Sequence, residues 1–190
     1  MIRFLIAALL TLVFWSGSPT QGAADPASFV REVSGALNVA AQTAKTSGAE
    51  AGRAEVEAVL TRYFDVAAMA VAALPKALQG AASPAYVAAY RGYLAKVFVR
   101  ETLRAGDGEL AILGARKSGA LTLVGSQVTV RGTRGRVVEW YLAARGGSYA
   151  VVNASVESVL ITQQNRRDFA DVLAAEGLPG LIERLQKGAL

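Results

Sequence analysis

The residue types that most often perform catalysis are sparse in this chain of 190 residues. It contains no histidine and no cysteine, which excludes Ser-His-Asp triads, cysteine nucleophiles, disulfides and the usual transition-metal sites. Hydrolysis by two carboxylic acids is the main enzymatic chemistry left, and Glu139 and Glu157 lie on neighbouring predicted strands. The alternative is that Glu139 faces solvent and Glu157 has a structural role. We favour this alternative and predict a protein that is not an enzyme and uses no cofactor or metal.

Composition and length predict a folded protein with one domain. Apolar residues make up 53% of the chain and charged residues 18%, which is too apolar for a disordered protein. The 20 basic and 15 acidic residues give a net charge of +5, which favours anionic partners. Arg131, Arg134 and Arg136 belong to a group of basic residues at the ends of predicted strands.

The first 24 residues have the pattern of a secretory signal peptide. An apolar run from Phe4 to Trp15 follows Arg3, and small residues precede Asp25. The run is shorter than the roughly 20 residues that a membrane-spanning helix needs. No cysteine follows it, so lipidation there is excluded. We expect cleavage before Asp25, export of a soluble domain over residues 25–190, and no contact with nucleic acid.

The elements that must position any site divide this domain into three parts. Apolar residues at intervals of three and four predict helices in the first part, and alternation predicts an antiparallel meander in the second. In the meander, Val138, Trp140 and Leu142 lie opposite Glu139 and Tyr141, so one face is buried. The three parts are a helical half at about 26–105, a meander at about 109–160 and C-terminal helices at about 163–187. The predicted strands are 109–116, 121–131, 136–145 and 148–160.

Three stretches in this order resemble the MlaC and toluene-tolerance family of periplasmic lipid-binding proteins. The first runs from Tyr63 to Met69, and the second is Ser83-Pro84 with the aromatic-spaced helix that follows. The third runs from Tyr149 through Glu157 to Phe169. The last strand departs from the family pattern at four positions, which leaves open a related branch associated with hopanoid lipids. These positions are Tyr149, Asn153, Ser158 and Leu160.

The resemblance implies an α+β fold in which helices wrap a twisted four-stranded antiparallel sheet around an apolar lipid cavity. It also implies a monomeric periplasmic carrier that shuttles phospholipid between an outer-membrane lipoprotein and porin complex and an inner-membrane ABC transporter. We expect the basic group Arg131, Arg134 and Arg136 to dock these partners. The residues expected to line the cavity are Phe64, Met69, Tyr90, Leu94, Phe98, Val128, Trp140, Leu142, Val152 and Val156.

The same apolar residues fit a second class of protein. A packed core needs the same residue types as a lipid cavity, so a non-lipid adaptor of the cell envelope has an indistinguishable composition. Cavity volume separates the two, because a packed core leaves few voids larger than a water molecule.

Overall fold

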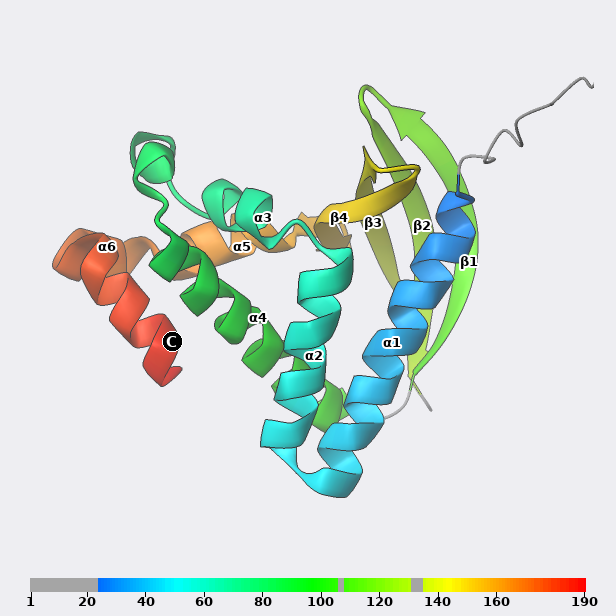
Figure 1. Ribbon diagram of the computed structural model, residues 1–190, viewed down its shortest axis with the longest axis horizontal. Coiled ribbons are helices and arrows are strands. Elements are labelled where there is room, and N and C mark those ends of the chain that lie inside the picture. The colour runs from blue at the N-terminus through cyan, green and yellow to red at the C-terminus, as the bar shows by residue number, and fades with distance from the viewer. Residues whose placement is uncertain (1–23, 106–107, 131–134) are drawn as a thin grey trace, which may run out of the picture.

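A computed structural model describes residues 24–105, 108–130 and 135–190, and the fold is α+β (Figure 1). The helices before the sheet are α1 (Pro26–Ser47), α2 (Ala49–Tyr63), α3 (Val66–Ala72), the 3-10 helix η1 (Lys76–Ala81) and α4 (Pro84–Ala105). The strands are β1 (Gly108–Ser118), β2 (Leu121–Val130), β3 (Arg136–Arg145), β4 (Ser148–Val156) and β5 (Val159–Leu160). The closing helices are α5 (Ile161–Asp168) and α6 (Ala170–Lys187). Within the described ranges, no helix is long and apolar enough to cross a membrane.

Local capping sets where three of the helices begin. The Asp25 carboxylate accepts a hydrogen bond from the Ser28 N–H at 2.8 Å, and Asp65 accepts one from the Ala68 N–H at 2.9 Å. Before α4, the Ser83 hydroxyl accepts from the Tyr86 N–H at 3.2 Å. Each cap satisfies a backbone N–H that has no partner inside its helix. These caps place the first residues of the three helices at Pro26, Val66 and Pro84.

The sheet is antiparallel with the order β1-β2-β3-β4-β5, so the prediction of four strands was wrong by one. The predicted strand at 148–160 is interrupted at Glu157 and Ser158, whose φ angles are 49° and 66°. These left-handed conformations form a tight turn that pairs β5 with the end of β4. The Glu157 N–H donates to the Val137 carbonyl at 2.9 Å, and its carboxylate accepts from the Val137 N–H at 2.6 Å. These bonds to β3 hold the turn.

The C-terminal helices begin two residues before the predicted position, because α5 starts at Ile161 directly after β5. Gly177 has φ 67° and ψ −171°, which interrupts the helical backbone of α6. The Glu176 carboxylate reaches across this break and accepts hydrogen bonds from Arg184 Nε at 3.0 and 3.1 Å. The two parts of α6 are therefore tied together by one ion pair.

Helices cover one face of the sheet. The α1–α2 hairpin lies beside the strands, α4 packs on α2 and α6, and α6 lies at the far side from β1 (Figure 1). The hairpin is tight because Gly52 has no side chain: a Cβ there would lie 2.3 Å from the Cβ of Ala44. The shared core contains Val30 and Val33 of α1, Val56 of α2, and Trp140 and Leu142 of β3.

Candidate functional site

The inner face of the sheet is the face that the helices cover. It carries most of the strand residues predicted to line a cavity. The register places Val124 opposite Trp140, and Ser126 opposite Val138, which itself lies opposite Val156. Directly opposed residues in a sheet share a face, so Val128, Trp140, Leu142 and Val156 lie on one side. Trp140 and Leu142 are buried, whereas Val128 and Val156 are half-buried.

Val152 stands apart from this pattern because β4 has a bulge. Leu142 pairs with Val151 and Tyr141 pairs with Asn153, which leaves Val152 without a partner on β3. Val151 is fully buried in the core, and Val152 is half-buried and outside it. Alternation alone could not distinguish these two valines, since both faces of the strand are apolar.

The indole of Trp140 is fixed by a polar residue that the sequence analysis did not select. Trp140 Nε1 donates to the Ser126 hydroxyl at 2.9 Å, and this hydroxyl donates to the Val138 carbonyl at 3.2 Å. Ser126 is fully buried, so both bonds are protected from water. The signal was present in the sequence, because Ser126 interrupts the apolar alternation between Val124 and Val128.

The five predicted lining residues that precede the sheet pack in or against the same core, but to different depths. Met69 and Tyr90 are buried, and Phe64, Leu94 and Phe98 are half-buried. These last three leave apolar surface exposed beside the core, as do Leu110 and Ile112 of β1.

Tyr90 lies in a cluster of aromatic side chains between α4 and the C-terminal helices. Its ring centroid is 6.1 Å from that of Tyr86, 6.4 Å from Tyr93 and 6.2 Å from Phe169. The Tyr90 hydroxyl accepts a hydrogen bond from Asn165 Nδ2 at 2.8 Å, and burial raises its pKa far above the ordinary value. The ring is thus held by packing and by a buried polar contact.

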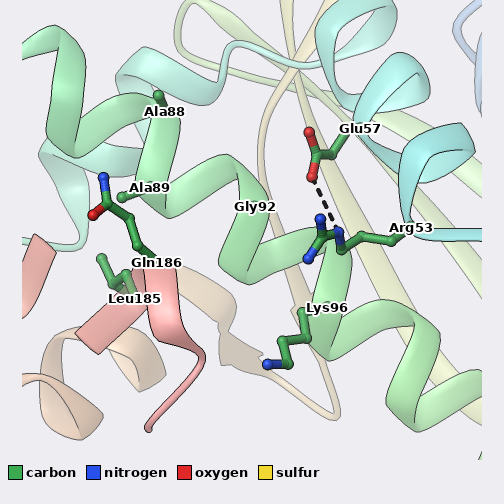
Figure 2. Close-up of a pocket in the computed structure, with 8 residues that line it drawn as sticks. All are labelled: Arg53, Glu57, Ala88, Ala89, Gly92, Lys96, Leu185 and Gln186. Carbon is green, nitrogen blue, oxygen red and sulfur yellow. Dashed lines mark ion pairs between the residues drawn. The ribbon is translucent and has the colours of Figure 1, made fainter. Parts of the chain in front are cut away.

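Two surface pockets lie outside this apolar layer, and none of the ten predicted residues lines either. The first, of about 250 Å³, lies between α2, α4 and the end of α6 (Figure 2). Small residues of α4 form its floor, and charged or amide side chains surround it; its residues are Arg53, Glu57, Ala88, Ala89, Gly92, Lys96, Leu185 and Gln186. Figure 2 shows Arg53 paired with Glu57, at 3.6 Å.

The second pocket, of about 210 Å³, lies between α1, α2 and the β3–β4 hairpin. The Tyr63 hydroxyl donates to Glu32 at 2.7 Å, and this contact raises the pKa of Tyr63. Arg62 lies 3.5 Å from Glu32, and Arg145 donates to the Arg62 carbonyl at 2.7 Å. Both pockets are smaller than the roughly 300–1,000 Å³ typical of ligand sites, so neither fits a pair of acyl chains.

The carboxylate pair considered for hydrolysis is engaged in structural contacts. Glu139 accepts from Arg116 at 2.7 Å and from the Tyr141 hydroxyl at 3.0 Å. Glu157 binds the backbone of Val137, as described above. Across the described part of the chain, no group of three or more acidic residues is arranged to hold a metal ion.

The predicted docking arginines are described only in part. Arg136 is exposed at the start of β3, opposite Val128 of β2. Arg131 and Arg134 lie outside the described residues.

The fold and its apolar layer define a class of protein: helices that cover one face of an open antiparallel sheet, with half-buried apolar side chains between them. The chain matches the MlaC protein family over residues 31–187, and it belongs to that family. The match confirms the resemblance found in the sequence. A comparison with curated proteins finds no match.

Among solved structures, the chain is similar to the phospholipid-binding protein from Ralstonia solanacearum, determined in complex with a phospholipid. The two chains are 15% identical and superpose with a TM-score of 0.67. The similarity covers 86% of this chain and 96% of the other, so the predicted α+β fold is confirmed over almost the whole domain.

Proposed function

We propose that this protein is a periplasmic carrier that binds the acyl chains of phospholipid between the inner face of its sheet and its helices. It transfers the lipid between an outer-membrane complex and an inner-membrane ABC transporter. Membership of the MlaC family over residues 31–187 carries this proposal. The phospholipid in the similar Ralstonia solanacearum structure supports the choice of ligand.

The energetics of acyl chains explain why an apolar layer suits this function. Each methylene removed from water contributes about 0.8 kcal/mol, so two chains supply a large affinity without a polar recognition site. The half-buried side chains of Leu94, Phe98 and Val128 already expose apolar surface that a lipid would cover. Leu142 and Tyr90 are fully buried and would instead pack behind the residues that contact the lipid.

The lipid content of the purified protein tests the proposal directly. Organic extraction followed by mass spectrometry should find co-purifying phospholipid, and the lipid-free protein should take up phospholipid from vesicles. A hopanoid in the extract would identify the related branch as the correct one. Absence of both lipids, together with no uptake from vesicles, would rule out carriage.

A packed-core adaptor of the envelope is the second candidate. The observation that favours it is that the two described pockets are small and separate from the predicted lipid-lining residues. The extraction experiment distinguishes the two candidates, because an adaptor with a packed core would contain no lipid.

The proposal includes export as a mature domain. Residues 1–24 act as a cleaved signal peptide, and residues 25–190 form the lipid-binding domain. N-terminal sequencing of protein recovered from the periplasm should begin at Asp25, whereas recovery of the uncleaved chain in the cytoplasm would contradict this part of the proposal.

A further inference from the structure

The β1 strand forms one edge of the sheet, because its single neighbour among the described strands is β2. Its first residues alternate between exposed and half-buried, but Leu113 and all of residues 114–118 are exposed. On the side away from β2, alternate residues of such a strand present backbone N–H and C=O groups to solvent. Figure 1 shows β1 at the rim of the molecule, opposite α6.

A bulge shapes this edge. Ile112 lies opposite Ser126 and Gly114 lies opposite Gly125, so Leu113 is the extra residue. Leu113 is 59% exposed, and a Cβ added at Gly125 would lie 3.7 Å from its Cβ. The leucine therefore rests over β2 on the outer face of the sheet, the face that carries Glu139 and Arg116, and adds an apolar contact beside the edge.

Positive charges flank the same segment on both faces of the sheet. Arg116 pairs with Glu139 on the outer face at 2.7 Å, with 61% of its side chain exposed. Lys117 donates to the neutral hydroxyl of Thr122 at 2.9 Å on the inner face. Among the described residues, Glu139 is the one carboxylate paired with these two cations, so the edge carries a net positive charge. Pairing with a second copy of this strand would bring the same cations together, which disfavours self-association.

We infer that residues 114–118 of β1 form a docking edge for an extended acidic segment of a partner protein, which adds to the sheet as a further strand. Backbone hydrogen bonds would supply much of the affinity, and acidic side chains beside Arg116 and Lys117 would select the partner. Leu113 would contact an apolar side chain of that segment. The purpose that we give this edge, lipid transfer, rests on the proposed carrier function. The geometry of the edge does not.

Synthetic peptides test this edge without a known partner. The probe is a short peptide of alternating valine and glutamate, compared with a lysine version and with two versions that are N-methylated at one or the other set of alternate amides. Fluorescence anisotropy measures affinity, and hydrogen exchange measures protection of amides 113–118. The acidic peptide should bind at least about tenfold tighter than the lysine peptide and slow exchange at this edge. Only one N-methylated version should bind, because only one set of amides faces β1.

A pair of charge reversals provides the matched control. Arg116→Glu with Lys117→Glu should weaken the acidic peptide at least about tenfold. Lys76→Glu with Arg104→Glu makes the same change in net charge on η1 and α4 and should leave binding within about twofold. Lipid content, measured in the same samples, reports separately on the proposed carrier function. Equal binding of both N-methylated peptides, protection at another surface, or dimerisation through β1 would overturn the docking edge.

Discussion

Tyr90 and Leu94 are one turn apart on α4, yet their surroundings differ. Tyr90 is fully buried, lies among three aromatic rings and is hydrogen-bonded to Asn165. Leu94 packs against the core but remains half-buried. Leu142 and Val128 repeat the contrast on the sheet. The structure thus combines fixed residues that stabilise the fold with half-buried residues whose apolar surface a ligand could cover, and substitutions should separate the two groups.

The largest effect is expected at a fixed residue of the sheet. Leu142→Ala should lower the free energy of unfolding by about 2–5 kcal/mol, because Leu142 is fully buried and its truncation leaves a cavity. The matched control is Leu103→Ala on α4, where the leucine is 44% exposed and the change should cost less than about 1 kcal/mol. Urea denaturation measures both. Equal losses in the two variants would contradict the distinction.

The next effect concerns the polar contact that holds α4. Tyr90→Phe should cost about 1–3 kcal/mol of stability, since it leaves the buried amide of Asn165 without its partner. Tyr93→Phe on the same helix is the control, because the Tyr93 hydroxyl has no hydrogen-bond partner among the described residues. Thermal unfolding with a lipid assay checks the result; a loss of bound lipid at unchanged stability would show that Tyr90 is a lining residue.

At the half-buried residues, the expected loss is in binding rather than in stability. Leu94→Arg should retain the fold, because a half-buried arginine can extend its charge to water, but should reduce bound phospholipid by roughly tenfold. Leu103→Arg, an exposed site on the same helix, should leave lipid content unchanged. Circular dichroism and mass spectrometry of extracted lipid measure the two properties. Unfolding of Leu94→Arg would assign Leu94 to the fixed group.

Reversing the charge of the predicted docking arginines should change docking to membrane partners without affecting the fixed residues or the half-buried residues. Reversal of Arg131, Arg134 and Arg136 to glutamate should slow lipid transfer between membrane complexes several-fold at low salt, and less once the Debye length falls to about 8 Å. Bound lipid should stay constant. Transfer between donor and acceptor vesicles that carry the partner complexes measures the rate; a salt-independent defect, or a loss of lipid, would show that these arginines act on the ligand.

The smallest effect is expected in α6, remote from the apolar layer. Hydrogen bonding to Arg184 lowers the pKa of Glu176. A carboxylate with a lowered folded-state pKa stabilises the fold above its ordinary pKa, and this contribution disappears as pH falls through the lowered value. Glu176→Gln should therefore reduce stability slightly at neutral pH and flatten its dependence below about pH 4.5. If the wild type and the variant show the same dependence of stability on pH, the ion pair between Glu176 and Arg184 contributes nothing to stability.

The sequence was most informative where a short segment determines the structure. Asp65 and Ser83 cap helices within three residues of themselves, and Gly177 breaks α6 by its own backbone conformation. Alternation along β3 likewise identified Trp140 and Leu142 as residues of one buried face.

Features that depend on residues far apart in the sequence could not be predicted from local patterns. The turn at Glu157 and Ser158 contains neither glycine nor asparagine, the usual left-handed residues, and depends on bonds to Val137. The bulge that buries Val151 in place of Val152 appears only once β3 is paired with β4. The pocket around Glu32 gathers residues from four separate elements, α1, α2, β3 and β4.

The direct join between β5 and α5 has a mechanical consequence. Leu160 ends the strand and Ile161 begins the helix, with no linker between them. Asn153 of β4 donates to the Thr162 hydroxyl at 2.8 Å, and Arg166 donates to the carbonyl of Ala72 on α3. Helix α5 therefore connects the sheet to the helical half through direct hydrogen bonds at both of its ends. We expect a rotation of the sheet to displace α3 as well, because both are hydrogen-bonded to the same short helix.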